Sequence, residues 1–306
     1  MLNRLLRPAA LLAAAGAITM LATACGDGGS PAASGSTPAY PALASSAACS
    51  QLRTQNPDMV GKTLTNAINP HTPGYESISV SDPTKYEGFD IDLGEAIGEC
   101  LGFTVKYLPV AFDALLPTLQ SGQADFVISD IYATQERAAS ADFITYSKVN
   151  DGVLVAAGNP KKLTGIDDSL CGTTTALNKG FVEVPLVEAQ SAKCQAAGKP
   201  PAQTALFDNN ADCVQAILSG RADAYINDVN TVARFVKDQP DKLARATAVT
   251  LPYSIGIAVP KGRLPIRNAF TAALTEIQQS GLQAQLSQKW QLDESAIEAP
   301  SLVTAS

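Results

Sequence analysis

The hydrophobic positions of this chain alternate between two spacings from about residue 62 onward. Short apolar runs with strand character lie at residues 63–68, 105–108, 125–129, 152–156, 173–177, 204–207, 224–227 and 255–259. Between and after them, apolar residues recur three and four positions apart, at residues 92–101, 114–121, 182–196, 211–219, 229–237, 265–279 and 282–290. That second spacing is typical of amphipathic helices. Alternating strands and helices predict an α/β fold with a mostly parallel sheet.

Two ten-residue segments of the chain nearly repeat each other, 98 positions apart (228 − 130). They are SGQADFVISD, residues 121–130, and SGRADAYIND, residues 219–228. Each follows a predicted helix, and Gly122 and Gly220 fall where a helix end favours left-handed backbone. Each ends on an Asp at the carboxyl end of a strand, the edge at which open parallel sheets bind ligands. We expect Asp130 and Asp228 to face one cleft, although chance similarity of two α/β units is the alternative.

The beginning of the chain has a different composition from the rest. Arg4 and Arg7 precede an Ala- and Leu-rich apolar stretch that ends just before Cys25. This pattern predicts a lipoprotein signal peptide over residues 1–24, with Cys25 lipidated; a plain secretory signal peptide is the alternative. Residues 25–49 are rich in Gly, Ser, Pro, Thr and Ala, which predicts a flexible tether. We therefore expect an extracytoplasmic protein that is anchored to the cell membrane by lipid at Cys25.

Charge and composition narrow the classes of partner. The net charge is −7 and no cluster of basic residues occurs, which argues against nucleic acid as a partner. His71 is the only histidine, so a site with several histidine ligands is excluded. We expect no metal, no cofactor and a monomeric protein.

The cysteines predict disulfides, because an exported chain matures in an oxidising compartment. Five cysteines remain besides Cys25. Cys171 with Cys194 is the first choice of pair. Cys49 with Cys100 would then leave Cys213 free and buried in a helix. The spacing leaves these pairings open.

Several segments, taken in order, resemble one known family. They are GFDIDLGEAI (residues 88–97), AFDALLPTLQSGQAD (111–125), SDIYATQER (129–137), DF (142–143), GRADAYIND (220–228) and KW (289–290). In this order they resemble the bacterial extracellular solute-binding proteins of family 3, the polar amino-acid-binding components of ABC importers. The resemblance covers about residues 62 to 292.

The resemblance implies a two-lobe, type II periplasmic-binding-protein-like fold with the ligand held between the lobes. Two crossing strands would join the lobes, near residues 151–156 and 252–257. The first lobe would comprise residues 50–153 and 255–306, and the second lobe residues 154–254.

The resemblance also implies a set of ligand-binding residues. Arg137 would grip the α-carboxylate of the ligand, a task suited to the planar guanidinium fork. Thr134 would begin a short helix beside it, and Asp228 would take the α-ammonium group. A surface ion pair for Arg137 and a helix N-cap for Asp228 are the alternative roles. The turn formed by Gly180, Phe181 and Val182 matches the family's turn whose backbone N–H groups hold the carboxylate.

Aromatic side chains and an extra acid complete the implied site: Phe112 and Tyr75 match aromatic positions of the family, whereas Tyr132, Phe181 and Asp130 depart from its pattern. Phe112 would stack on the ligand or else join the core, and Tyr75 is a similar aromatic in the first loop. Tyr132, three positions after Ser129 in the ligand segment, replaces a small polar residue and would narrow the pocket. Asp130 stands where relatives carry a small neutral residue. It would favour a ligand with additional positive charge, unless it caps the following segment or screens Arg137.

These features together predict the function. We expect a lipid-anchored substrate-binding protein that captures an amino acid or related cationic zwitterion by hinge closure. It would deliver this small-molecule ligand to an ABC permease and would not be an enzyme. Alternatives are an enzyme on the same scaffold, since cyclohexadienyl dehydratases resemble this family, and a ligand-sensing partner of a membrane receptor.

Overall fold

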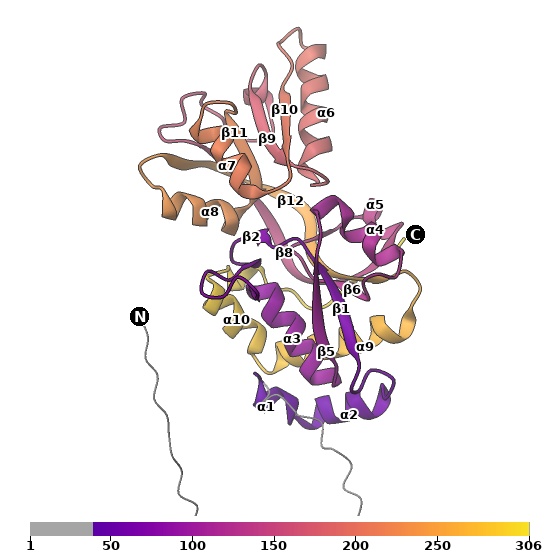
Figure 1. Cartoon of the computed structure of the whole chain (residues 1–306). Helices are drawn as coiled ribbons and strands as arrows, with labels where there is room; N and C mark the ends of the chain where they lie inside the picture. The colour runs from indigo at the N-terminus through magenta and orange to yellow at the C-terminus, as the bar shows by residue number, and fades with distance from the viewer. Residues whose placement is uncertain (1–38, 306) are drawn as a thin grey trace, which may run out of the picture. The chain divides into compact units, whose positions relative to one another are not determined.

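One continuous sheet runs through the whole folded part (Figure 1). The structure, a computed structural model, describes residues 39–305, apart from the side chain of Val149. The strand order in the sheet is β10-β9-β11-β8-β12-β6-β1-β5. Its strands are β1 (Thr63–Ile68), β5 (Thr104–Pro109), β6 (Phe126–Val127), β8 (Ala141–Ala156), β9 (Thr174–Asn178), β10 (Gln203–Phe207), β11 (Ala224–Asp228) and β12 (Leu243–Pro260). Two short strands lie off this path: β7 (Tyr132–Ala133) pairs with β12, and β13 (Leu302–Val303) pairs with β8.

The long antiparallel strands β8 and β12 join the two halves of the fold. At one end β12 pairs with β6 and β7, and at the other end β8 pairs with β11. Their mutual register shifts between Thr250 and Ser254, where the chain passes from one half to the other. The flanking pairs are parallel, β5-β1-β6 in lobe 1 and β10-β9-β11 in lobe 2. The predicted α/β fold with two lobes and two crossing strands is confirmed.

Lobe 1 buries its sheet beneath helices from both ends of the chain. These are α3 (Phe89–Leu101), α4 (Leu115–Gln120), α9 (Leu264–Gln279) and α10 (Leu282–Trp290). Phe103, Phe126 and Phe270 pack together in its core, with ring centroids 5.1–6.1 Å apart. Fully burying a side chain of this size stabilises a fold by about 1.5–3 kcal/mol. The C-terminal helices therefore complete lobe 1.

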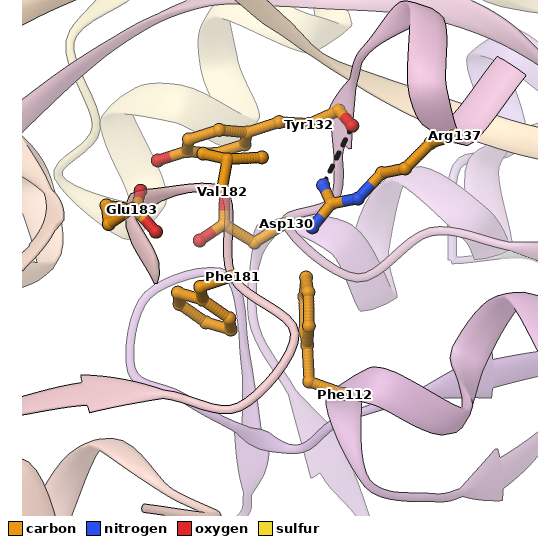
Figure 2. A pocket seen from close by; sticks show the side chains of 7 residues that line it. All are labelled: Phe112, Asp130, Tyr132, Arg137, Phe181, Val182 and Glu183. Carbon is orange, nitrogen blue, oxygen red and sulfur yellow. Dashed lines mark hydrogen bonds between the residues drawn. The ribbon is translucent and has the colours of Figure 1, made fainter. Parts of the chain in front are cut away.

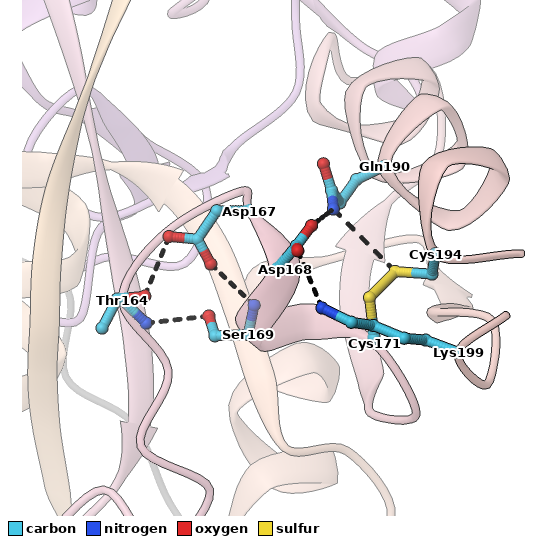
Figure 3. A network of polar contacts seen from close by, with 8 residues as sticks. All are labelled: Thr164, Asp167, Asp168, Ser169, Cys171, Gln190, Cys194 and Lys199. Carbon is cyan, nitrogen blue, oxygen red and sulfur yellow. Dashed lines mark hydrogen bonds and ion pairs between the residues drawn. A yellow bond between two sulfur atoms is a disulfide. The ribbon is translucent and has the colours of Figure 1, made fainter. Parts of the chain in front are cut away.

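Lobe 2 carries helices α6 (Glu183–Ala196), α7 (Asn210–Leu218) and α8 (Val229–Asp238). A disulfide joins Cys171 to Cys194 on α6, so the first-choice pairing is confirmed. Figure 3 shows the polar network around it: Asp168, in the 3-10 turn η2 (Asp168–Leu170), accepts hydrogen bonds from Lys199 at 2.8 Å and from Gln190 at 3.1 Å. These contacts fix the far end of α6 and leave its first turn to face lobe 1.

The two copies of the repeat occupy equivalent places in the two lobes. Gly122 follows α4 with φ 74°, and Gly220 follows α7 with φ 70°. The strands β6 and β11 come next, and Asp130 and Asp228 follow or end them. The repeat therefore reflects two similar helix–Gly–strand units, as predicted.

Ordered structure begins earlier than predicted. Helices α1 (Pro41–Ala44) and α2 (Ala47–Gln55) fall partly within residues 25–49, the segment predicted as a tether. A disulfide between Cys49 and Cys100 ties α2 to α3, and the Glu99 carboxylate accepts hydrogen bonds from the backbone of Ala39 and Tyr40. The predicted boundary at residue 49 is therefore too late, because this segment is held on lobe 1. The predicted signal peptide and Cys25 lie outside the described residues.

Short elements complete the fold of lobe 1. A small sheet comprises β2 (His71–Thr72), β3 (Glu76–Ile78) and β4 (Tyr86–Glu87); the turns η1 (Phe112–Ala114) and η3 (Glu294–Ala296) and helix α5 (Gln135–Ala138) lie elsewhere in lobe 1. Cys213 is buried and free, as one of the considered pairings required. No helix within residues 39–305 has both the length and the apolar character needed to cross a bilayer.

Candidate functional site

A small pocket lies between the two lobes (Figure 2). Lobe 1 lines it with Phe112, Asp130, Tyr132 and Arg137, and lobe 2 lines it with Phe181, Val182 and Glu183. The centre of a water molecule can occupy about 10 Å³ of this pocket, so the pocket has room for one water molecule. An amino acid does not fit in this geometry, so ligand entry requires the lobes or the lining side chains to move.

Arg137 links the two lobes at one side of this pocket. Its Nη1 donates to the Tyr132 carbonyl at 2.9 Å, and its Nη2 donates across the cleft to the Gly180 carbonyl at 2.8 Å. Its guanidinium lies 5.3 Å from the centre of the Phe112 ring. Thr134 caps the short helix α5 by accepting from the Arg137 backbone N–H at 3.1 Å. Two of the five guanidinium N–H donors are thus engaged, and three remain for an anion.

Asp130 is a buried carboxyl group without a compensating partner. Its backbone has φ 42°, in the left-handed region, and its N–H donates to Asp90 Oδ2 at 2.5 Å. Its Oδ1 is buried and has no hydrogen-bond partner among the described residues. Burial raises the pKa of Asp130 well above its ordinary value, and the charge of Asp228 raises it further. Asp130 thus does not act as a cap through Oδ1, and no ion pair joins it to Arg137 in the described part of the chain.

Asp228 serves as the N-cap of α8, and its charge acts on the buried Asp130. Its Oδ1 accepts from the backbone N–H groups of Asn230 at 2.8 Å and Thr231 at 3.3 Å. Burial raises its pKa to about 7, and the hydrogen bond from Asn230 limits the rise. Asp228 is outside the seven lining residues, but its charge is the largest electrostatic influence on Asp130. The structure therefore brings the two repeat carboxyls into one buried acidic region.

Two further acids in this region are absent from the sequence prediction. Glu183 lines the pocket, is 1% exposed, and has no hydrogen-bond partner for either carboxyl oxygen among the described residues. Asp151 is fully buried and lies opposite Asp228 in the β8–β11 register. Tyr132 donates its hydroxyl to Asp151 Oδ1 at 3.1 Å. The sequence offered one indication of a role for Glu183, because this residue directly follows the predicted turn of residues 180–182. An acid there also suits the first turn of a helix, so the sequence alone does not assign it to the site.

The aromatic residues form the wall of the pocket. The rings of Phe112 and Phe181 meet across the cleft with centroids 4.3 Å apart. Tyr132 forms the opposite side in Figure 2, and its hydroxyl donates to Asp151 of β8. Gly180 has φ 77°, and a Cβ there would lie 2.9 Å from the Asp113 Cβ, so this close approach of the lobes requires glycine.

Two predicted residues lie behind the pocket rather than in its lining. Ser129 is fully buried; its hydroxyl donates to Glu76 Oε1 at 3.1 Å and accepts from the Asn69 N–H at 2.8 Å. Tyr75 is buried, and its hydroxyl accepts across the cleft from Asn230 Nδ2 at 3.1 Å. Both residues therefore fix the surroundings of the site in this geometry. In residues 39–305 no group of three or more His, Cys, Asp or Glu side chains is arranged to hold a metal ion.

The family model of bacterial extracellular solute-binding proteins, family 3, matches residues 64–293. The chain belongs to this family. It is 30% identical over 230 residues to a probable histidine-binding protein of Neisseria gonorrhoeae, a match that spans 72% of this chain and 80% of that protein. A putative ABC transporter arginine-binding protein 2 of Escherichia coli is 25% identical over 233 residues, or 75% of this chain and 90% of its own length.

Solved structures show the same fold. An ancestral arginine-binding protein bound to arginine superposes with a TM-score of 0.67 at 29% identity, over 76% of this chain and 99% of that chain. The same kind of ancestral protein bound to glutamine gives a TM-score of 0.64 at 30% identity, over 74% and 97%. The resemblance read from the sequence segments is thus confirmed at the level of family and fold. Amino-acid-binding proteins of ABC transporters are the relatives found.

Proposed function

We propose that this protein captures an amino acid with a cationic side chain outside the cytoplasm and delivers it to an ABC permease. The observation that carries the proposal is the buried, unbalanced acidity of the interlobe region. Asp130, Asp151, Glu183 and Asp228 are each at most 5% exposed, whereas Arg137 is the single basic residue that lines the pocket. Buried carboxylates are unfavourable unless paired with positive charge. A ligand with more cationic than anionic groups supplies that charge.

The proposed ligand contacts follow from the donors and acceptors at the site. Arg137 has free donors for the α-carboxylate, Asp228 accepts the α-ammonium, and Asp130 adds negative charge toward the side chain. Charge-assisted hydrogen bonds contribute about 1.5–3 kcal/mol each. Four to six of them reach the roughly −8 kcal/mol of micromolar binding after the cost of immobilising the ligand. Phe112, Phe181 and Tyr132 would pack on its apolar part when the lobes close.

The anchoring and lobe boundaries belong to the same proposal. Cys25 would carry the lipid, residues 26–38 would link it to the folded part, and the protein would act as a monomer. Residues 39–153 and 255–306 would move as one lobe against residues 154–254. Because the disulfide between Cys49 and Cys100 joins α2 to α3, the anchor would hold lobe 1 near the membrane, and lobe 2 would be free to close.

Binding, rather than catalysis, is what we propose for this site. Curated relatives carry the names of transport binding proteins, and His71 lies outside the seven residues that line the pocket. The buried carboxyl groups are the one feature that an acid catalyst would also need. Turnover of prephenate or arogenate by the purified protein would contradict the proposal.

A thermal-shift comparison of amino acids tests the ligand class. At a concentration about 100 times the Kd, a ligand stabilises the folded state by about 2.7 kcal/mol, which raises the Tm by about 5 °C for a chain of this size. We expect L-arginine, L-lysine and L-ornithine to give shifts of this order, L-glutamine a smaller one and L-glutamate none. The Asp130→Asn variant should lose about tenfold of its preference for arginine over glutamine. The largest shift with glutamate would refute the role of Asp130.

A further inference from the structure

We propose that Glu183 and Asp151 form a second cation subsite, at the side of the pocket opposite Arg137, that holds the side-chain cation of the ligand. The inference rests on the proposed function and adds to it the residues that would bind the end of the ligand's side chain. These residues belong to α6 and to crossing strand β8. The ligand chemistry that fits is a guanidinium or ammonium group separated from a carboxylate by an aliphatic spacer.

The first observation is the state of the two carboxyl groups. Three of their four oxygens, both of Glu183 and Oδ2 of Asp151, are buried without a hydrogen-bond partner in the described chain. Unpaired buried carboxyl oxygens are rare in folded proteins, because each loses the hydrogen bonds it made to water. Burial raises the pKa of Asp151, and the charge of Glu183 and a proton shared between the two carboxyl groups raise it further, so the two acids lie within hydrogen-bond reach of each other.

The second observation is the direction in which these groups face. Glu183 is one of the seven residues that line the pocket, and Figure 2 shows its carboxyl group across the pocket from the Arg137 guanidinium, with Asp130 between them in this view. The ion pairs found in residues 39–305 include neither Glu183 nor Asp151. Arg137 is the cation of the protein that acts on Glu183, and Glu183 is the strongest charge acting on Arg137, so a single guanidinium faces the several buried acids of this region.

The third observation is the position of Tyr132. Its hydroxyl donates a hydrogen bond to Asp151 Oδ1, so Asp151 Oδ2 and the two Glu183 oxygens are the acceptors available to a ligand. A guanidinium group carries five donors in a plane, and an ammonium group carries three, so either satisfies these oxygens together. With the α-carboxylate on Arg137, the side-chain cation would lie against Glu183 and Asp151 Oδ2.

The test compares two ligands that differ in charge but not in shape. L-arginine and L-citrulline are titrated by calorimetry at pH 8 into the wild type, Glu183→Gln and Asp151→Asn, with Glu188→Gln as the matched control on the exposed face of the same helix. We expect Glu183→Gln to raise the Kd for arginine at least about tenfold and the Kd for citrulline less than about twofold. Asp151→Asn should act in the same direction, and Glu188→Gln should leave both ligands unchanged.

Each contrary result identifies what has failed. An equal loss for arginine and citrulline in Glu183→Gln, or no loss for either, would overturn the subsite. Loss of charge discrimination in Asp130→Asn alone would also overturn it while leaving the proposed function intact. If the wild type binds neither ligand, both proposals fail. Circular dichroism and the Tm of each variant verify that it is folded.

Discussion

Replacement of Arg137 by Ala is expected to weaken binding of the amino-acid ligand at least about 100-fold while the protein stays folded. Removal of one partner of a buried charge pair costs about 3–5 kcal/mol, because the ligand carboxylate is left without a counterion. The folded state loses the two hydrogen bonds from Arg137 to the carbonyls of Tyr132 and Gly180, at about 1 kcal/mol each, together with the contact of the guanidinium with the Phe112 ring. Calorimetry gives the Kd, and thermal melting gives the stability.

The Arg137→Lys variant is the control for geometry. It keeps the positive charge but loses the planar fork that matches a carboxylate, so its affinity should fall between those of the wild type and Arg137→Ala. Near-normal affinity in Arg137→Ala would show that the carboxylate is held elsewhere. If Arg137→Ala does not fold, the affinity of Arg137→Lys tests the same prediction, because it should still be lower than that of the wild type.

The stability of the ligand-free protein is expected to fall as the pH rises from 5 to 8. Burial raises the pKa of Asp90 to about 6 and that of Asp228 to about 7, so the folded state holds protons that the unfolded chain releases near pH 4. The contribution of these two groups to the free energy of unfolding is therefore largest below pH 4. It falls as the pH rises toward the folded-state pKa values of about 6 and about 7. Between pH 5 and its pKa of about 6, Asp90 alone accounts for a loss of about 1.4 kcal/mol, or a fall of about 3 °C in the Tm.

A cationic ligand should reverse this trend. At pH 8 its positive charge replaces the protons, so the ligand-induced rise in Tm should be larger at pH 8 than at pH 5. Melting curves between pH 5 and pH 8, with and without L-arginine, measure both effects. A Tm that rises steadily with pH in the absence of ligand would show that the buried acids are paired by a mechanism not seen in this geometry.

The sequence predicted the fold well where periodicity and local chemistry agree. Residues 63–68 and 282–290 form the expected strand and helix without change of bounds, and Gly122 and Gly220 end their helices in left-handed conformation. The crossing strands were underestimated, since residues 141–156 and 243–260 are continuous strands. Polar residues such as Asn150 and Thr250 interrupt their apolar pattern, because a strand between two lobes is not covered along its whole length.

The candidate site was predicted in part. The structure places four of the predicted residues, Arg137, Asp130, Phe112 and Tyr132, around one pocket. Glu183 and Asp151 were missed, because an acid at the start of a helix or within a strand has an ordinary structural explanation. Only the three-dimensional arrangement reveals that these carboxyl groups are buried together without a counterion.

A crystal structure of the protein with L-arginine tests the central claim most directly. We expect one arginine between the lobes, with its carboxylate about 2.7–2.9 Å from Arg137 donors and its ammonium and guanidinium groups at similar distances from the buried acids. Arginine bound outside the interlobe region, or with its guanidinium against Arg137, would contradict the account.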